Sequence, residues 1–484
     1  MTTNNGYRTL WRWHFYAGLF VMPLLIVLAV TGTLYCFQPQ IERVIYRDRL
    51  VVEPQAQPRL PEEALLARAA GILPKGAVAS SARIANDPTL SAEFIFRLPD
   101  GERESVYVNP YTGAVLGTLS VEHRFMQIDR MLHRKLMLGK PGELLMELAA
   151  CWTLVMIGTG IALWWPREGA RAGRQFWPDF SMKGRALWKS VHAVLGVWLA
   201  VGALAFIVTG LPWTGSWGKQ FKSLATSANL GAPPGAWGGL RLHSQARGGE
   251  SPSGESANAQ GADHAGAGAG AGADASRMGS MPGMTMDDMP LANVPWAVGA
   301  VPVPRVPAHA HDPRARLPLD RLVEDVRRFG LTDAYEIAFP QSPDGVYTVT
   351  YFPPDPRGER TLYLDQYSGA VLKDIRYRDY GVVAKAISFG TSLHMGRYFG
   401  LANQIVCTLI SLGLAAMAVT GCVMWWKRRP VGKLGAPGRE HGMPPMHVWK
   451  VGLALLGILF PLMGASLVAV WVTDRALFGR PGER

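Results

Sequence analysis

The class of fold is decided by residues 13–41, WHFYAGLFVMPLLIVLAVTGTLYCFQPQI, which contain no Asp, Glu, Lys or Arg. Four later stretches share this property, namely 148–166, 190–218, 398–426 and 451–473. Each is long enough to cross a hydrocarbon core of about 30 Å as a helix. The first stretch is not typical of a signal peptide, because its apolar part is too long and no small-x-small cleavage site follows it. The sequence therefore predicts an α-helical integral membrane protein with five transmembrane helices.

The composition agrees with a membrane-embedded chain. Of 484 residues, 48% are hydrophobic and only 18% are charged, whereas soluble proteins carry about a quarter of charged residues. The 16 Trp residues belong to a type that collects at membrane–water interfaces. These values exclude a soluble enzyme, a fibrous protein and a wholly disordered chain.

The basic residues predict how the chain crosses the membrane. Much of the net charge of +12 lies in the short loops 167–189 and 427–446, which the positive-inside rule places in the cytoplasm together with the N-terminus. The long segments 38–142 and 214–397 then lie outside, and the tail 474–484 with them. Because this charge is explained by topology, no nucleic-acid partner is expected. The four Cys residues form no CxxC motif, so neither a disulfide framework nor a zinc site is predicted.

An internal repeat organises the chain. His14 aligns with His192, and His133 aligns with His394, and in both alignments the same motifs follow at the same spacing without gaps. The matched motifs are Gly18 and Gly196, Thr31-Gly32 and Thr209-Gly210, Thr159-Gly160 and Thr420-Gly421, and Trp164-Trp165 and Trp425-Trp426. The repeated unit is a helix, an external domain and a second helix, and it occurs twice.

Each external domain is predicted to be a small α+β module. The segment 106–116, VYVNPYTGAVL, resembles 362–372, LYLDQYSGAVL, and both read as a strand followed by a turn. The other predicted elements are a helix at 61–70 with strands at 92–98 and 104–109 in the first module, and a helix at 319–329 with strands at 345–352 and 360–365 in the second. The stretch 227–316 is rich in Gly, Ala, Ser, Pro and His and is predicted to be a disordered insertion.

The four repeated histidines are the candidate ligands. A single His near a helix end is usually a capping or interfacial residue, and four at matched positions beside a membrane indicate a function more strongly. His14 and His192 begin helices at the cytoplasmic face, whereas His133 and His394 precede helices on the outside. Each face therefore has one pair, and two facing imidazoles are what a six-coordinate haem iron requires. A closed zinc site is less expected, because it needs four converging ligands.

Three further residues bear on the haem hypothesis. Gly18 and Gly196 lie one helical turn after His14 and His192, where glycine leaves room for a porphyrin plane. Small residues also allow helices to pack closely, and the sequence favours neither explanation. His447 begins the fifth predicted helix at the cytoplasmic face and is an alternative inner ligand, although no glycine follows it at the same spacing.

The repeated Leu-His and Thr-Gly motifs, together with segment 106–116, resemble the PepSY-associated transmembrane family of bacterial inner-membrane proteins. That family includes iron-regulated proteins and ferric-siderophore reductases such as the ferrioxamine reductase. The resemblance covers nearly the whole chain except 227–316 and the fifth helix. It implies two periplasmic PepSY-like domains and two haem b groups per chain, held in opposite leaflets by the four repeated histidines. It also implies that electrons pass from the cytoplasmic side to a periplasmic ferric siderophore, which releases its iron as Fe(II).

Two alternatives remain open at this stage. The insertion carries a cluster of methionines, Met278, Met281, Met284, Met286 and Met289. Thioethers are soft ligands that suit Cu(I), so a Cu(II) reductase is one alternative, although low-complexity drift in a solvated linker is the more expected explanation of the cluster. The other alternative is a non-enzymatic membrane accessory or metal-handling protein whose histidines only cap helices. The chain has no dinucleotide-binding motif and no flavin-sized cytoplasmic loop, so the electron donor is expected to be another protein, a quinol or a soluble reductant.

The predicted domain boundaries follow from these assignments. They are transmembrane helix one at 1–37, the first periplasmic domain at 38–125, the outer haem segment with helix two at 126–166, a cytoplasmic loop at 167–189, helix three at 190–213, the periplasmic insertion at 214–317, the second periplasmic domain at 318–380, the outer haem segment with helix four at 381–426, a cytoplasmic loop at 427–446, helix five at 447–473 and a periplasmic tail at 474–484.

Overall fold

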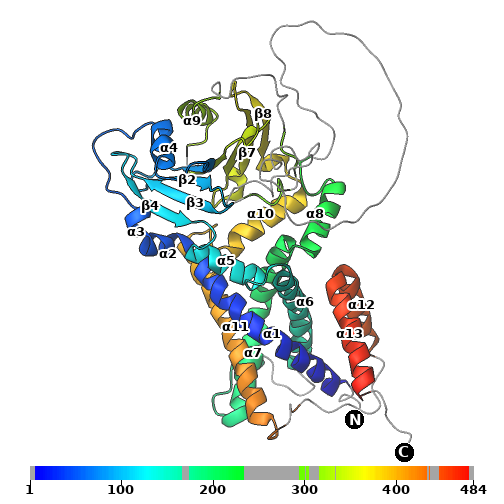
Figure 1. The fold of residues 1–484 in the computed structure, drawn as a ribbon. Coiled ribbons are helices and arrows are strands. Elements are labelled where there is room, and N and C mark those ends of the chain that lie inside the picture. The colour runs from blue at the N-terminus through cyan, green and yellow to red at the C-terminus, as the bar shows by residue number, and fades with distance from the viewer. Residues whose placement is uncertain are drawn as a thin grey trace, which may run out of the picture.

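The structure is a computed structural model, and it places a helical bundle below a β-sheet domain (Figure 1). It describes residues 6–165, 174–233, 294–299, 301–304, 316–332, 334–432, 435 and 446–478. The methionine cluster of the insertion lies outside the described residues, as do most of the Gly- and Ala-rich stretch and parts of both basic loops. The prediction that the whole of 227–316 is disordered is wrong, because Trp296, Val298 and Val301 are buried in an apolar cluster with residues of the sheet domain.

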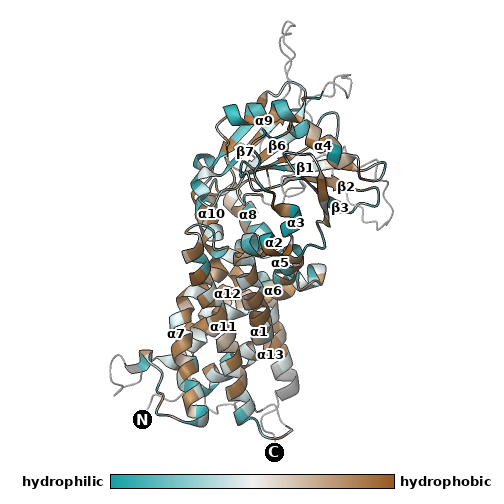
Figure 2. Cartoon of the chain, turned by 90° about the vertical axis from the view of Figure 1, so that its left-hand side faces the viewer, coloured by the Kyte–Doolittle hydropathy of each residue, from teal (hydrophilic) through white to brown (hydrophobic). Residues whose placement is uncertain are grey.

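Four helices are long and apolar enough to cross a membrane. They are α1 (Tyr7–Cys36), α6 (Gly139–Trp164), α7 (Gly184–Gly210) and α11 (Leu401–Arg428). Both α1 and α7 pack against α6 and α11, so the four form one bundle. Apolar residues dominate along the bundle, whereas polar residues are frequent on the sheet domain (Figure 2). These helices match the first four transmembrane helices that the sequence predicts.

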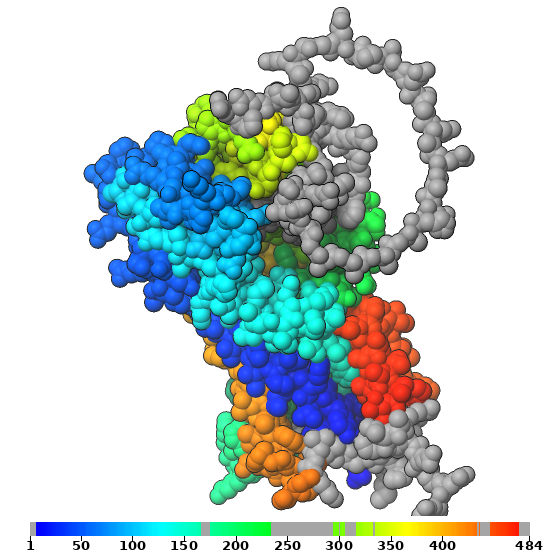
Figure 3. Space-filling view, viewed as in Figure 1, coloured from blue at the N-terminus to red at the C-terminus, as the bar shows by residue number. Residues whose placement is uncertain are grey.

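The predicted fifth transmembrane helix at 447–473 is wrong. The chain instead forms two shorter apolar helices, α12 (His447–Leu459) and α13 (Pro461–Phe478), which pack against each other in a lobe beside the bundle (Figure 3). The helix breaks at Phe460, because a proline disfavours helical geometry in the residue before it. The second helix runs back beside the first (Figure 1).

The external strands form one continuous antiparallel sheet rather than two separate sheets. Its order is β4-β3-β2-β1-β5-β6-β7-β8. The strands are β1 (Val78–Ile84), β2 (Ala92–Arg97), β3 (Arg103–Val108), β4 (Val115–Ser120), β5 (Tyr335–Ala338), β6 (Val346–Tyr351), β7 (Arg360–Asp365) and β8 (Val371–Arg376). The two predicted modules meet where β1 pairs with β5. The sequence predicts β2, β3, β6 and β7 correctly and misses the other four strands.

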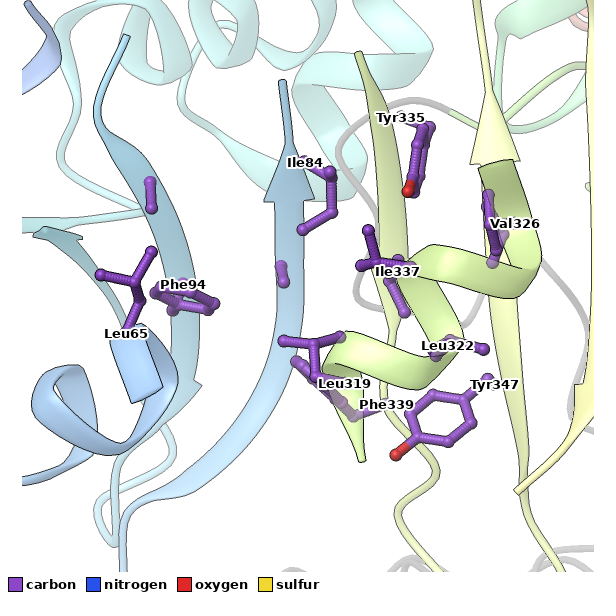
Figure 4. Close-up of a cluster of buried hydrophobic side chains, with 14 of the residues drawn as sticks. Leu65, Ile84, Phe94, Leu319, Leu322, Val326, Tyr335, Ile337, Phe339 and Tyr347 are labelled. Atoms are coloured by element: carbon purple, nitrogen blue, oxygen red, sulfur yellow. The ribbon is translucent and has the colours of Figure 1, made fainter. Parts of the chain in front are cut away.

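Two helices cover one face of the sheet and join the modules. They are α4 (Glu62–Ala70) and α9 (Leu319–Arg328), and both confirm helices that the sequence predicts. Leu65, Phe94, Leu322 and Ile337 meet in the core beneath them (Figure 4). Each helix also provides a carboxylate for the first turn of the other. Glu63 accepts a hydrogen bond of 2.7 Å from the backbone N–H of Leu319, and Asp320 accepts one of 2.5 Å from that of Glu62. Carboxylates at helix N-termini satisfy otherwise unpaired N–H groups.

The opposite face of the sheet lies on helices that lead into the bundle. They are α5 (Phe125–Lys135), α8 (Trp217–Ser227) and α10 (Val382–His394), and α10 runs beneath the sheet toward α11 (Figure 1). Ala384 and Ile387 of α10 belong to a second apolar cluster with Val346 and Tyr363 of the sheet. The remaining short helices are α2 (Gln38–Ile45), α3 (Arg47–Leu50) and the 3-10 turns Arg174–Phe176, Leu211–Trp213, Pro356–Gly358 and Tyr377–Asp379. The sheet domain thus rests on the helix that ends at His394.

The contact between the sheet domain and α10 contains a titratable group. Glu359 is 2% exposed, and it accepts a hydrogen bond of 3.1 Å from the Ser388 hydroxyl of α10. Burial raises the pKa of Glu359 to about 7. A carboxyl whose pKa is higher in the folded than in the unfolded state stabilises the fold at low pH, and this contribution disappears as pH rises through the folded pKa.

We therefore expect the stability of the sheet domain to fall between about pH 4.5 and 7, by up to about 3 kcal/mol from this one group. The Glu359→Gln variant keeps an acceptor for Ser388 and carries no charge, so its stability should lose most of this slope. Thermal unfolding monitored by circular dichroism across this pH range measures the difference. An equal slope in both proteins would contradict the role of Glu359.

Candidate functional site

Each of the four repeated histidines bonds to a threonine on a different helix. His14 lies on α1, His192 on α7, His133 near the end of α5, and His394 at the end of α10. Their Nδ1 atoms lie within hydrogen-bonding distance of a threonine Oγ1. The pairs are His14–Thr159 at 3.0 Å, His133–Thr31 at 2.8 Å, His192–Thr420 at 2.9 Å and His394–Thr209 at 2.8 Å. The same contact therefore occurs four times, twice in each half of the chain.

These bonds determine which imidazole nitrogen carries the proton. Each threonine hydroxyl donates its only hydrogen to a carbonyl one turn back in its own helix. The acceptors are the carbonyls of Val27 for Thr31 at 2.6 Å, Val155 for Thr159 at 2.7 Å, Ala205 for Thr209 at 2.7 Å and Met417 for Thr420 at 2.9 Å. With that hydrogen donated to the carbonyl, the hydroxyl oxygen accepts a hydrogen bond from the imidazole, which assigns the ring hydrogen to Nδ1. The lone pair of Nε2 is left free to bind a metal.

The glycine after each threonine lets the imidazole lie against the helix backbone. A Cβ atom added at Gly32 or Gly160 would lie 3.3 Å from Cε1 of His133 or His14, respectively. At Gly210 and Gly421 the corresponding distances to His394 and His192 are 3.6 and 3.5 Å. At Gly32 and Gly160 an added methyl group would require the ring to shift by a few tenths of an ångström, whereas at Gly210 and Gly421 it would make an ordinary van der Waals contact. The sequence shows the Thr-Gly pairs as part of the repeat, but their role as partners of the histidines requires the fold. The signal that points to it is that each Thr-Gly pair recurs at the same position in both copies of the repeat.

The inner pair has the separation that a metal ion between two imidazoles requires. The ring centroids of His14 and His192 lie 6.3 Å apart, and the ring planes are inclined by 85°. Two metal–nitrogen bonds of about 2 Å, together with the distance from each nitrogen to its ring centre, give roughly this separation. The two residues come from the first and third membrane helices, as the sequence predicts for an inner pair. His14 and His192, each with a free Nε2 at this spacing, would hold a haem iron, which supplies one-electron chemistry when it is bound.

The outer pair lies at the opposite end of the bundle, beneath the sheet domain. Desolvation of the His133 ring, with smaller effects of His394 and Arg134, lowers the pKa of His133 to about 3. Desolvation likewise lowers the pKa of His394 to about 4. His133 and His394 are therefore electrostatic neighbours, and both are neutral at physiological pH. Neutral imidazole is the form that binds metals, so this pair also fits a haem iron.

The remaining sequence candidates lie apart from the ring nitrogens of the two pairs. A Cβ at Gly18 would meet the methyl group of Met156 at 3.7 Å, and one at Gly196 would meet that of Met417 at 3.3 Å. Both glycines thus face a methionine of a neighbouring helix, which favours their role in close helix packing. His447 is the exposed first residue of α12. No hydrogen bond or ring contact joins it to the inner pair within the described part of the chain.

Other metal-binding chemistry has less support in the described residues. No group of three or more His, Cys, Asp or Glu side chains there converges on one point. The four cysteines are all free thiols. The arrangement is thus two pairs of imidazoles, one near each end of the four-helix bundle.

The sequence match supports the same architecture. No curated protein matches the chain significantly. The family model described as the PepSY-associated TM region matches residues 11–428. This range runs from the first turns of α1 to the end of α11 and leaves α12 and α13 outside. It includes both histidine pairs, their threonines and the whole sheet. The chain therefore belongs to the family of PepSY-associated transmembrane proteins.

Proposed function

We propose that the protein is a di-haem electron-transfer protein that reduces a periplasmic ferric siderophore with electrons from the cytoplasmic side, so that iron leaves as Fe(II). The observation that carries this proposal is the hydrogen-bond pattern of the histidines. All four present a free Nε2, and the four form one pair at each end of the bundle. Histidines that only cap helices would have no reason to adopt the same tautomer, or to bond in each case to a threonine on another helix.

The roles of the residues follow from this pattern. A bound haem iron accepts and releases one electron at a time. His14 and His192 would hold one haem, and His133 and His394 the other. The four threonines keep the rings in the required tautomer and orientation, as partners outside the coordination sphere generally do. His14 and Thr31 lie on the same helix, 17 residues apart, so the two sites are separated by about 25 Å along it.

The proposed orientation places the sheet domain in the periplasm of a bacterial inner membrane. The basic loops at the far end of the bundle support this orientation by the positive-inside rule. The outer pair then lies directly beneath the sheet domain, because α10 packs on the sheet and ends at His394. A polar ferric chelate would reach this end of the bundle without entering the hydrocarbon. Each Fe(III) takes up one electron and becomes Fe(II), which the chelator holds less tightly.

Reoxidation of the reduced protein tests the proposal. Purified protein in detergent is reduced with dithionite, freed of excess reductant and mixed with a panel of ferric siderophores in the presence of ferrozine. We expect Fe(II) to appear at the same rate as the oxidised haem spectrum returns. The His123→Ala variant is a matched control, because His123 is an exposed residue bonded to Ser120. Absence of haem from the wild-type protein would instead favour the non-enzymatic alternative.

The same assay decides about the methionine cluster. Deleting 250–300 would also remove Trp296, Ala297 and Val298, which are buried against the sheet and α10. Deleting 250–290 spares them and is expected to leave ferric reduction largely intact, because this segment has no counterpart in the first half of the repeat. If ferric chelates fail to reoxidise the protein while Cu(II) succeeds only with this segment present, the substrate is copper.

A further inference from the structure

A cavity of about 290 Å³ lies where the two halves of the sheet meet. Its lining includes Arg83, Glu336, Thr350, Phe352, Pro354 and Arg397. Arg83 of β1 pairs with Glu336 of β5, and Glu336 pairs with Thr350 of β6. Residues that pair across antiparallel strands share one face of the sheet. Ile337 alternates with Glu336 and belongs to the core under α4 and α9, so this trio lies on the other face, toward the bundle.

Two guanidinium groups line the cavity. Arg83 is exposed and forms no salt bridge or hydrogen bond through its side chain with any described residue. Arg397 donates a hydrogen bond of 2.6 Å to the carbonyl of Phe352, and its guanidinium lies 4.5 Å from the centre of that ring. Glu336 is the one carboxylate among the lining residues. The lining therefore carries a net positive charge.

The two arginines also repel each other. Burial lowers the pKa of Arg397, Tyr35 and Glu359 act in the opposite sense, and the charge of Arg83 lowers it by a smaller amount. Each arginine has a carboxylate near it, since Glu93 pairs with Arg83 across β1 and β2 and Glu359 acts on Arg397, but Glu93 forms its ion pair with Arg124. Guanidinium groups bind carboxylates and related oxyanions with paired hydrogen bonds. The two guanidinium groups in the lining thus provide the hydrogen bonds that an anionic ligand requires.

The cavity lies next to the outer histidine pair. Arg397 follows His394 by three residues, so their Cα atoms are at most about 11 Å apart. The hydroxyl of Ser392 donates a hydrogen bond to the carbonyl of Pro354 in the cavity lining. The segment that presents His394 is therefore bonded directly to the wall of the cavity.

We propose that this cavity binds the anionic oxygen donors of a ferric chelate and makes the protein select anionic chelates, of the catecholate or carboxylate class, over neutral or cationic ones. This inference rests on the proposed function and identifies its substrate class. The volume lies at the low end of small-molecule sites, so the cavity accommodates the charged part of a chelate and leaves the remainder outside. Arg83 is free to bind the anion, and Arg397 orients it beside the outer pair.

Binding of redox-inert gallium chelates tests the inference separately from electron transfer. The full-length protein is titrated with a Ga(III) tris-catecholate complex and a neutral Ga(III) tris-hydroxamate complex. We expect the wild type to bind the catecholate at least about tenfold more tightly, and Arg83→Glu to lose about tenfold in that affinity with little change for the hydroxamate. Arg97→Glu is the matched control, because Arg97 lies on the neighbouring strand β2, outside the cavity lining.

The possible outcomes separate the two proposals. Equal affinity for both gallium chelates would overturn the inference, and so would an Arg83→Glu effect no larger than that of Arg97→Glu. The proposed function would stay intact in either case if ferric chelates still reoxidise the protein. Selective catecholate binding that depends on Arg83 in a protein that no ferric chelate reoxidises would support the site and contradict the proposed function. Arg397→Gln, which keeps a donor for the carbonyl of Phe352, should weaken catecholate binding in the same direction.

Discussion

Replacing His133 by alanine is expected to reduce the haem content from about two to about one per chain. The variant loses one axial ligand of the outer site, and the remaining His394 alone does not hold a six-coordinate iron. The inner site, which lies near the other end of α1, should keep its haem. His394→Ala should have the same effect, whereas His14→Ala and His192→Ala should remove the inner haem and spare the outer one. Haem content by pyridine haemochrome and redox titration of the remaining haem measure both effects.

A matched control distinguishes ligand loss from general destabilisation. His447→Ala removes an exposed imidazole at the start of α12 and is expected to keep both haems. If His447→Ala abolishes the inner haem while His14→Ala or His192→Ala keeps it, the lobe formed by α12 and α13 supplies an axial ligand. The assignment of the inner pair would then be wrong.

Replacing one of the four threonine partners is expected to have the second largest effect on haem binding. Thr31→Val removes the acceptor of the hydrogen bond from His133 Nδ1 and leaves a buried N–H without a partner, which costs about 1–3 kcal/mol. Loss of a partner outside the coordination sphere lowers metal affinity by roughly 10- to 100-fold. We therefore expect Thr31→Val to release its outer haem to excess apomyoglobin much faster than the wild type does. The midpoint potential of that haem should also shift, because the hydrogen bond affects the basicity of the ligand.

Two further variants make this experiment specific. Thr33→Val is the matched control on the same helix, since the Thr33 hydroxyl donates to the carbonyl of Ala29 at 2.8 Å and contacts no histidine. Thr31→Ser keeps the acceptor and should restore haem retention. An effect of Thr31→Val no larger than that of Thr33→Val would show that the threonine has only a packing role.

The sequence predicts the membrane part of the fold well where one physical property decides it. The lengths of the apolar stretches suffice to predict the helices α1, α6, α7 and α11. They do not suffice for 447–473, where Pro461 divides an equally apolar segment into two helices. Hydropathy alone does not register such a break, although the conformational restriction before a proline makes it understandable.

The external part is less predictable because its contacts lie far apart in the chain. Strand β1, VASSARI, has weak alternation of apolar and polar residues and is stabilised by pairing with β2 and β5. The pairing of β1 with β5 joins the two halves of the repeat, and neither half alone indicates it. The candidate site shows the same limit. The histidines can be found from the repeat, whereas each threonine partner lies between 102 and 228 residues away.

The most direct measurement of the central claim is the haem stoichiometry of the purified protein, combined with low-temperature EPR of the oxidised form. We expect about two haem b per chain, both low-spin with two histidine ligands. The inner haem should give a highly anisotropic low-spin signal, because the planes of His14 and His192 are nearly perpendicular. A protein without haem, or one whose haem is high-spin or covalently attached, would contradict the account.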